Sequence, residues 1–486
     1  MAKNKSIKLN YIFNLAYQLL LIVVPLVTAP YLSRVLTPNG VGTYSYTFSI
    51  VSYFVLFATL GTTTFGQRAI GYTQDNVEER SRAFWETFIF RTITSVFTLA
   101  VYFVVFCVIG SENVAIYAVF ALNIVNIIFD ISWFLQGMEE FGKTVLGNAV
   151  CKILSVVCIF LFVKDSSDLV IYAAIMMGFT LLGSMQMWVF LPKYISKVKG
   201  INPFRSIKDI LQLFVPTIAI QLYTVLDKSM IGWFTETNEQ NGFYEQSEKI
   251  VKIALTVVTS LGAVMIPRIA HMFKTGETEK VKEFLYTSYR FVWMISIPIC
   301  FGLFVVSDVF VPVFFGEGYE PCILLIKIFC PLIIFIGISN VTGLQFLVPT
   351  GKNNVFTLTV AVGAVINLIL NLFLIPRYFA VGASIASIIA EFCVTVCGFI
   401  YVAKTKAYKI LPILISSWKY WIAAAIMFLV LYFVKPLFNV SVLSLVLLIL
   451  IGIAVYFISL LALVDKFLID AIKRAFSVIS SNLKRK

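Results

Sequence analysis

Charged residues are scarce in this chain, and histidine is nearly absent. Only 13% of the 486 residues are Asp, Glu, Lys or Arg, against about 25% in an ordinary soluble domain. The single histidine, His271, lies in a polar loop and gives no support for a His-based metal site or a Ser–His triad. The eight cysteines are scattered without a CxxC pair, which favours small buried thiols. We therefore expect no enzyme active site, no cofactor and no catalytic metal.

Long hydrophilic segments are missing as well. No loop exceeds about 25 residues, too short for a folded domain outside the membrane. Hydrophobic residues make up 60% of the chain, whereas soluble domains have roughly 45–50%. A membrane-spanning helix needs about 20 mainly apolar residues. Fourteen segments meet this length, with approximate limits 11–32, 43–66, 83–109, 114–136, 145–163, 169–191, 210–232, 243–266, 284–308, 321–347, 355–375, 381–403, 418–435 and 440–463. The sequence predicts an all-α integral membrane protein with about 14 transmembrane helices.

The basic residues are distributed unevenly between the two sides of this topology. About 26 of the 38 Lys and Arg residues fall in the termini and the even-numbered loops, and the odd-numbered loops hold only Arg34, Lys164, Arg377 and Lys435. The positive-inside rule then places both termini in the cytoplasm. The formal net charge of +13 is explained by topology, because no soluble domain with a basic patch for nucleic acid is visible. The basic tail is predicted to lie on the anionic leaflet.

An internal repeat has an offset of about 200 residues. "GTYSYTFSIV" from Gly42 matches "GFYEQSEKIV" from Gly242, and Arg68 and Arg268 each follow their glycine by 26 residues. The repeat divides the chain into two six-span halves, followed by two further spans and the tail: 1–200, 201–405, 406–465 and 466–486. Because six spans return the chain to its starting side, the halves should be parallel repeats related by an axis along the membrane normal. A cavity between such halves suggests alternating access.

Four charges lie on one face of the eighth predicted span. Glu245, Glu248, Lys249 and Lys252 follow the i, i+3, i+4, i+7 spacing of a helix face. At 1.5 Å per residue, Lys252 lies about 15 Å from Gly242, near the middle of a roughly 30 Å hydrocarbon core. Charges at this depth cost about 2.5 to 3.5 kcal/mol each and normally face a cavity or a partner. The alternative is that the four merely form ion pairs that neutralise one another.

The seventh span carries a polar stripe with a charge at its end. Thr217, Gln221, Thr224 and Lys228 share one face, and Asp227 lies about 100° away from Lys228. The two spans are joined by a short loop, so we expect their polar faces to line one compartment. Lys228 could instead snorkel to the interface, with Asp227 balancing a cation. In contrast, the repeat-related face of the second span, Ser45, Phe48, Ser49 and Ser52, is uncharged.

Other ionisable residues in the spans are harder to interpret. Arg290 lies about two turns inside the ninth span and Arg34 lies at the outer mouth, so both are intermediate between structural and functional roles. Glu391 sits near the middle of the twelfth span, and the sequence gives no account of it. A further group near the ends of spans three to five is interpreted as a packing network: Glu86, Arg91, Asp130 and Lys152.

Several segments resemble the polysaccharide-transporter (Wzx-type) flippases of the multidrug/oligosaccharidyl-lipid/polysaccharide superfamily. They are "PYLSRVLTPNGVGTYSYTFSIVSYF", "LDKSMIGWF" followed by "NGFYEQSEKIV", "GAVMIPRI" and "NLILNLFLIPRYFAVGASIASIIAEF". The resemblance covers essentially the whole chain. It implies a V-shaped central cavity lined by spans one, two, seven and eight. It also implies translocation of undecaprenyl-pyrophosphate-linked oligosaccharide across the bacterial cytoplasmic membrane, alongside membrane lipids and other glycan-assembly proteins.

The resemblance also implies a cationic lumen, which matches Lys249 and Lys252. We predict that these lysines, with Arg290 and Lys228, hold the pyrophosphate. Carboxylates would balance the charge or couple transport to Na⁺ or H⁺: Glu245, Glu248 and Asp227. Further lumen residues would contact substrate, the tyrosines its sugars: Gln221, Thr224, Tyr44, Tyr223 and Tyr244.

Three other functions remain as alternatives. An ion-coupled multidrug exporter of the same superfamily would favour an acidic lumen for cationic drugs. A lipid II flippase would carry buried Arg and Asp in the first two spans, and here Arg34 lies only at the mouth. A membrane-embedded glycan polymerase or ligase would need a large outer loop, whereas the longest here is about 234–242.

Overall fold

Every described element of the computed structural model is a helix, and the description covers residues 7–108, 113–470 and 472–473. The chain forms two compact units, Met1–Gly242 and Phe243–Lys486. Most of the predicted basic tail, 466–486, lies outside the described residues. The predicted division near residue 200 follows the sequence repeat and stays a prediction. The compact units divide later because the helix at 207–234 packs against the first helix of the chain.

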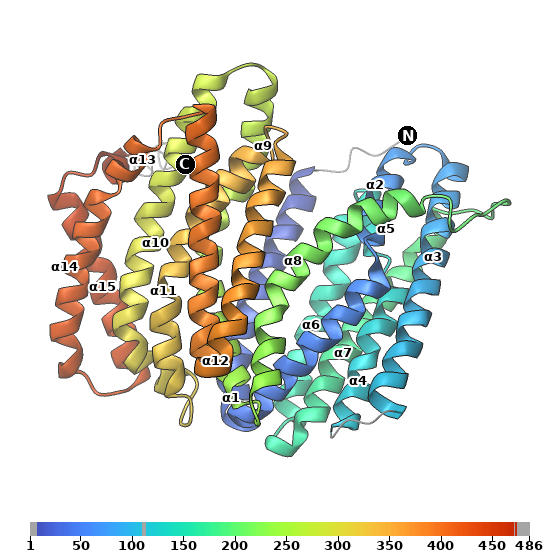
Figure 1. Cartoon of the computed structure of the whole chain (residues 1–486), viewed down its shortest axis with the longest axis horizontal. Helices are drawn as coiled ribbons and strands as arrows, with labels where there is room; N and C mark the ends of the chain where they lie inside the picture. The colour runs from blue at the N-terminus through green and yellow to red at the C-terminus, as the bar shows by residue number, and fades with distance from the viewer. Residues whose placement is uncertain (1–6, 109–112, 471, 474–486) are drawn as a thin grey trace, which may run out of the picture. The chain divides into compact units, whose positions relative to one another are not determined.

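Eleven described helices lie wholly within the first unit, coloured blue to green in Figure 1. They are α1 (Ile7–Thr59), α2 (Thr62–Tyr72), α3 (Val77–Phe103), the π-helix η1 (Val104–Val108), α4 (Val114–Phe129), α5 (Ser132–Gly137), α6 (Phe141–Phe162), the short 3₁₀ helices η2 (Ser166–Asp168) and η3 (Gln186–Lys193) on either side of α7 (Leu169–Met185), and α8 (Ile207–Phe234). Within this unit α1 packs against α3, α4, α6 and α8. Its core includes Phe120 and Ile124 of α4, which are fully buried.

The second unit begins just inside α9 (Glu239–Lys274), which crosses the boundary between the units. It continues through α10 (Thr278–Phe314), α11 (Pro321–Asn340), the π-helix η4 (Val341–Leu347), α12 (Asn353–Thr405), α13 (Leu411–Ser416), α14 (Trp418–Val434), η5 (Lys435–Leu437) and α15 (Val442–Ala462). Here α10 packs against α11 and α14, and α14 packs against α15. The added pair α14 and α15 therefore belongs to this unit.

Two of the long helices contain sharp reversals at non-glycine residues. Thr37, directly before Pro38, has φ 61° and separates the first two predicted spans within α1. Phe379 has φ 49° and separates the eleventh and twelfth spans within α12. Ten apolar helical stretches long enough to cross a membrane occur in the described residues, and these two each hold a pair of crossings. With α8 and α9, of 28 and 36 residues, they match the fourteen predicted spans.

One predicted span was wrong at its end, and a second is interrupted before its end. The span predicted over 43–66 ends at Thr59, where Gly61 has φ 77° and a Cβ on it would lie 3.0 Å from the Phe214 nitrogen. The span predicted over 114–136 matches the apolar stretch Val114–Gly137, but its helix is interrupted at Asp130, whose carboxylate accepts a hydrogen bond from the Ser132 N–H at the start of α5. Both breaks use local chemistry that hydropathy does not register.

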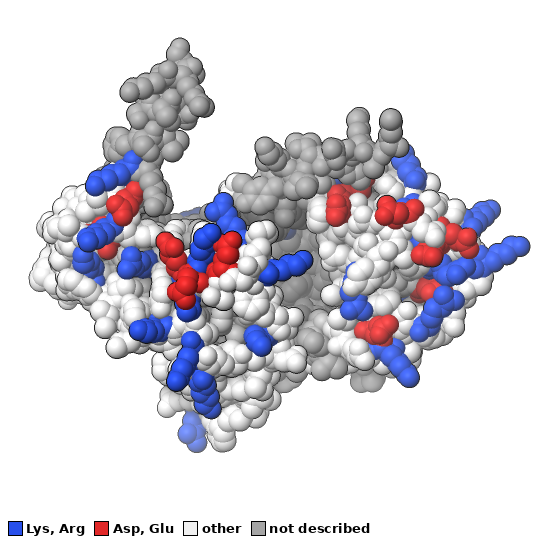
Figure 2. Space-filling model, turned by 90° about the horizontal axis from the view of Figure 1, so that it is seen from above, with Lys and Arg blue, Asp and Glu red and all other residues white. Residues whose placement is uncertain are grey.

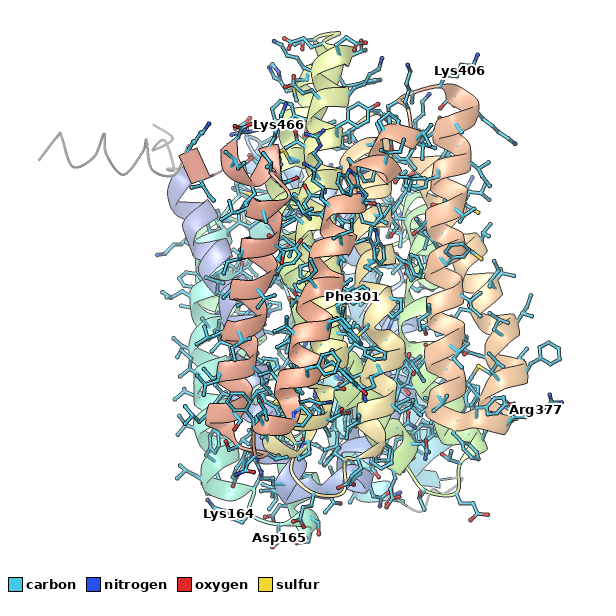
Figure 3. The ribbon with its side chains drawn as sticks, turned by 90° about the vertical axis from the view of Figure 1, so that its left-hand side faces the viewer. Lys164, Asp165, Phe301, Arg377, Lys406 and Lys466 are labelled. Atoms are coloured by element: carbon cyan, nitrogen blue, oxygen red, sulfur yellow. The ribbon has the colours of Figure 1, made fainter. Side chains whose placement is uncertain are left out.

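The outer surfaces of the helices are strongly apolar. Large side chains such as Phe373 and Phe433 are 66% and 71% exposed, which in water would create extensive sticky patches. In Figure 3, Lys406 and Lys466 lie at one end of the second unit and Arg377 lies at the other. This placement agrees with a multi-pass membrane protein whose loops alternate between two sides. Which side is cytoplasmic stays a prediction.

Candidate functional site

The charged face predicted on the eighth span forms on α9. The helix runs unbroken through Glu245 to Lys252, so the four side chains share one face. Lys252 Nζ lies 2.7 Å from Glu248 Oε1, and Lys249 Nζ lies 3.6 Å from Glu245 Oε1. Lys249 also donates a hydrogen bond of 3.1 Å to Gln246 Oε1. The structure therefore contains the i,i+4 ion pairs that the alternative interpretation requires.

The four charges are not sheltered equally. The Lys252 side chain is 57% exposed and its partner Glu248 only 14%, while Lys249 and Glu245 are 29% and 22% exposed. The ammonium groups thus reach farther from the protein surface than the carboxylates do. An incoming anion would meet the lysines before it met the carboxylates. With this geometry, the lysines can pair with the carboxylates of their own helix and still be accessible to an anion.

Tyr244, on a face of α9 next to the charged one, is buried against α11 and α12 in the second unit. Tyr244 is 2% exposed, its ring lies 5.3 Å from that of Phe329, and its hydroxyl is 3.4 Å from Ser387 Oγ. Ser387 also accepts from Asn367, which in turn accepts from Asn371. The sugar contact predicted for Tyr244 stays a prediction, and this conformation holds the ring away from the charged face.

Glu391 lies on α12 one turn beyond Ser387 and is 8% exposed. It therefore extends the line of buried polar groups formed by Asn367, Asn371 and Ser387. The sequence offered one signal for this set: its members recur within the segment "NLILNLFLIPRYFAVGASIASIIAEF" at helical spacing. Among the described residues, no group of three or more His, Cys, Asp or Glu could hold a metal ion.

In the first unit, residues next to the predicted polar stripe of α8 contact α1, and the stripe itself stays a prediction. Ser229 Oγ donates to Ser49 Oγ at 3.0 Å and to the Tyr53 hydroxyl at 3.1 Å. Asp227 is only 6% exposed and lies within electrostatic range of Tyr53. Lys228, the next residue, is half-buried. Asp227 is thus part of the α1–α8 interface.

The remaining predicted residues of the first unit occupy different surroundings. Tyr44 packs against the rings of Phe120 and Tyr172, with centroids 5.2 and 4.8 Å apart. Arg34 is exposed and donates to the Pro30 carbonyl. Thr224 is exposed, Gln221 is half-buried, and the Thr224 hydroxyl donates to the Gln221 carbonyl. The side chain of Tyr223 lies outside the described part of the chain.

Gly42 and Gly242 begin the two repeated segments. Each lies close to the backbone carbonyl of the residue four positions before the other glycine. A Cβ on Gly42 would lie 1.7 Å from the Asn238 carbonyl oxygen, and a Cβ on Gly242 would lie 2.0 Å from the Pro38 carbonyl oxygen. Asn238 also donates from its backbone N–H to Asn39 Oδ1 and from its side chain to Thr43. Residues 38 and 238 have the same offset of 200 as the two glycines.

A cavity of about 520 Å³ lies within the first unit, bounded by α6 and α7. Asp130 and Lys152 line it, together with Thr144, Asn148 and Ser155 of α6. The sequence interpretation assigned Asp130 and Lys152 to a packing network. Arg91 does lie buried, 3.3 Å from Asp130, but Lys152 borders the cavity. The sequence signal for this cavity was the polar face of α6. On that face four polar residues recur at intervals of three and four: Thr144, Asn148, Lys152 and Ser155.

Arg290 is placed apart from the predicted pyrophosphate lysines. It lines a second cavity, of about 1290 Å³, between α10, the end of α12 and α13. Neither Lys249 nor Lys252 lines that cavity. The structure therefore brings together the predicted α9 residues and separates Arg290 from them within the second unit.

Comparison with known proteins gives relatives along most of the chain. The chain is 24% identical over 411 residues to a putative O-antigen transporter of Escherichia coli, covering 82% of this chain and 98% of that one. It is 25% identical over 260 residues to a probable low-salt glycan biosynthesis flippase of Haloferax volcanii, covering 52% and 53%.

Solved structures share the fold. The lipid II flippase MurJ in an inward closed conformation matches with a TM-score of 0.73 at 18% identity, covering 94% of this chain and all of that one. An inward-facing multidrug resistance transporter of the MATE family matches with a TM-score of 0.63 at 13% identity, covering 79% and 94%. A family described as polysaccharide biosynthesis protein matches residues 7–273. More than half of the chain thus fits that family, within a transporter fold shared with MurJ and MATE proteins, and the chain belongs to the polysaccharide biosynthesis protein family.

Proposed function

We propose that this protein is a flippase that moves undecaprenyl-pyrophosphate-linked oligosaccharide repeat units across the bacterial cytoplasmic membrane for surface polysaccharide assembly. Family membership and the transporter and flippase names of its relatives support this class of function. The fold shared with MurJ and MATE proteins supports alternating access as the mechanism. Other glycan-assembly proteins would act before and after it on the same lipid-linked substrate.

The observation that carries the proposal is the pair of lysines presented by α9. Lys252 is more than half exposed while its carboxylate partner is sheltered, so the ammonium can leave Glu248 for a more highly charged anion. A unit charge pair 4 Å apart gives about 4 kcal/mol at an effective dielectric near 20. This energy is comparable with the cost of holding a lysine at membrane depth. A pyrophosphate, with more than one negative charge, would engage Lys249 and Lys252 together.

The carboxylates of α9 have a second part in this scheme. Glu245 and Glu248 would hold the lysines in ion pairs between cycles. Their negative charges also balance the two lysines when no substrate is bound. The α9 face then carries no net charge, which lowers the free-energy cost of exposing it while the protein changes conformation. The polyprenyl tail, being entirely apolar, would stay in the surrounding lipid throughout.

The fold alone is equally compatible with drug export and with lipid II transport. The α9 face favours an anionic substrate over a cationic drug, since its most exposed charged group is an ammonium. Drug susceptibility of a strain lacking its own pumps separates these two functions. Resistance conferred by the protein would support the exporter.

The direct test is Lys252→Ala in a strain that depends on this protein for surface glycan. We expect surface glycan to fall at least tenfold while the protein is inserted in the membrane at the normal level. Arg82→Ala is the matched control, because Arg82 also forms an i,i+4 ion pair, 3.1 Å from Glu78, on a different helix. Normal glycan levels with properly inserted Lys252→Ala would overturn the assignment of the α9 face.

A further inference from the structure

Arg290 lines a cavity in the second unit that the proposed function does not use. It lies between α10, the C-terminal end of α12 and the loop leading into α13, and its volume is about 1290 Å³. Figure 3 shows Lys406, which lines it, at the same end of the unit as Lys466. In the space-filling view from above, many basic and acidic side chains lie on this surface (Figure 2). The cavity therefore opens among polar groups at one end of the helices.

Basic side chains dominate its lining. Lys280 and Lys282 are each paired at 2.7 Å, with Glu277 and Glu279 respectively. The other three basic groups are Arg290, Lys406 and Lys409. Among the described residues, no carboxylate lies within 4.0 Å of the charged groups of these three. Glu283 is the remaining acidic residue of the lining, so the cavity keeps a positive excess.

Hydroxyl groups fix the loop that carries two of these lysines. The Tyr286 hydroxyl accepts from the Lys409 N–H at 3.1 Å and donates to the Lys409 carbonyl at 3.3 Å. Below it, Tyr289 and Tyr408 form a buried hydroxyl pair at 2.8 Å, and Tyr289 is also 2.7 Å from Thr342. Burial raises the pKa of Tyr408 well above its ordinary value, so this link stays uncharged. The loop is held in place before any ligand arrives.

The backbone at Lys406 is strained in a way that a glycine would relieve. Lys406 ends α12 with φ 52°, the left-handed conformation in which glycine is strongly favoured. A lysine at such a position is a backbone outlier that calls for an explanation in function. Its side chain lines the cavity, and that is the feature a glycine would lack.

The cavity lies at the depth of lipid phosphates and beside an apolar surface. Phe301 lies at mid-height in Figure 3, and Arg290 is 11 residues earlier on α10, about 16 Å away along the axis and thus near the edge of a roughly 30 Å hydrocarbon core. Leu411 and Ile415 of α13 are 67% and 58% exposed, and Trp418 is 49% exposed. Trp is typical of the membrane interface. Positive charge and exposed apolar side chains therefore meet at one place.

We propose that this cavity binds the phosphate of an anionic membrane phospholipid. The phosphodiester would lie among Arg290, Lys406 and Lys409, and the acyl chains would run along Leu411 and Ile415. The ligand is a lipid of the surrounding bilayer and not the translocated substrate, so the site is independent of the proposed function. Bound there, the lipid would join the ends of α10 and α12 to α13.

The test measures lipid binding to the purified full-length protein by native mass spectrometry, with phosphatidylglycerol and phosphatidylcholine compared at equal concentration. We expect phosphatidylglycerol to be retained at least tenfold more tightly. Each lysine near the membrane surface contributes about a fivefold factor, so Lys406→Gly combined with Lys409→Gln should weaken phosphatidylglycerol binding by about 25-fold. Lys466→Gln removes an exposed charge at the same end outside the cavity lining and should change it less than twofold.

Lys406→Gly alone separates binding from folding. Because glycine prefers this backbone conformation, the variant should unfold at the same temperature as the wild type or higher, yet lose about fivefold in phosphatidylglycerol binding. Equal retention of the two lipids would overturn the proposal. So would unchanged binding by the double variant. Displacement of the lipid by millimolar inorganic phosphate or pyrophosphate would assign the cavity to a soluble anion instead.

Discussion

The segments from Gly42 to Ser52 and from Gly242 to Lys252 occupy corresponding places in the repeat but have different chemistry. Positions 45, 48, 49 and 52 are Ser, Phe, Ser and Ser in the first segment, and Glu, Glu, Lys and Lys in the second. In the first unit Ser45, Ser49 and Ser52 are buried, at most 7% exposed. In the second unit Lys252 is 57% exposed. The serines of the first face are therefore packed although Phe48 is 40% exposed, whereas Lys252 is the most exposed group of the second face, where Glu248 is 14% exposed.

Helix hydrogen bonding explains why serine suits the packed face. Ser52 donates to the Phe48 carbonyl at 2.7 Å, and Ser49 donates to the Tyr46 carbonyl while accepting from Ser229. A hydroxyl can be satisfied within its own helix, so α8 can approach closely. A charged group at the same depth needs water or a counter-ion. The difference suggests that the two halves have divided support and substrate binding between them.

The largest expected effect comes from making the second face like the first. Glu245→Ser, Glu248→Phe, Lys249→Ser and Lys252→Ser together should leave a helix that still inserts but reduce transport at least a hundredfold, because about 4 kcal/mol of attraction to the pyrophosphate is lost. Flipping of a fluorescent lipid-linked oligosaccharide in proteoliposomes measures this. The swap Glu248→Lys with Lys252→Glu, which keeps an ion pair, is the control for helix stability. If the fourfold variant transports within twofold of the wild type, the charged face of α9 is not needed for transport and the proposed difference in role between the two faces is wrong.

The reverse change should damage folding. Ser49→Lys places a charge at a position that is 0% exposed and in contact with Ser229 of α8. We expect a loss of about 3 kcal/mol in the free energy of unfolding, the cost of a charge at membrane depth. Thermal unfolding in detergent checks it, with Ser49→Ala as the variant that keeps the packing. An unchanged unfolding midpoint would mean that the first face can open as the second does.

A smaller effect is expected where the two segments begin. Gly242→Ala forces a Cβ to within 2.0 Å of the Pro38 carbonyl oxygen, and Gly42→Ala does the same at Asn238. Overpacking of this kind costs about 1 to 3 kcal/mol. Gly178→Ala in α7, where nothing lies within 4 Å of the added Cβ, should instead stabilise by up to about 1 kcal/mol. Unfolding midpoints of the three variants test the reciprocity: a large loss at only one of Gly42 and Gly242 would contradict it.

The smallest effect is expected from the hydroxyl link between α1 and α8. Ser229→Ala removes the hydrogen bonds to Ser49 and Tyr53. Hydrogen bonds between membrane helices average about 0.6 kcal/mol, so the unfolding midpoint should fall by a degree or two and transport should remain. Val225→Ala, one turn earlier on the same helix, tests apolar packing for comparison. A loss of transport without a loss of stability would show that this link takes part in switching.

Hydropathy and helical spacing predicted the membrane class, the long helices and the α9 face. These features depend on residues that are close together in the chain. The four charged residues between 245 and 252 share one face of the helix, whatever that helix packs against. Spacing did not predict the contact between the Tyr244 hydroxyl and Ser387. It also did not predict that Arg290 lines a different cavity from the lysines assigned to the pyrophosphate. Those placements depend on α10, α11 and α12, which follow far along the chain.

The surroundings of Asp227 were also beyond the sequence. Spacing along the seventh span gave its angle from Lys228, but whether it faced lipid, water or protein was not a property of α8 alone. Its burial at 6% exposure comes from the approach of α1, which Gly232 permits by leaving room for the Tyr46 ring. The position of one helix against another is set by such complementary surfaces, and a single helix shows only half of each surface.

By itself the sequence determined that this chain is a helical membrane protein with a repeated pattern, one of whose copies is charged. Covalent geometry fixes both facts, because the spacing of residues along a helix cannot change. The tertiary structure alone decided which polar faces became interfaces and which became cavities. It buried Ser49 of α1 against Ser229 of α8, left Lys252 exposed, and gathered Arg290, Lys406 and Lys409 around one cavity. The reason is that burial depends on what a distant segment brings to a surface.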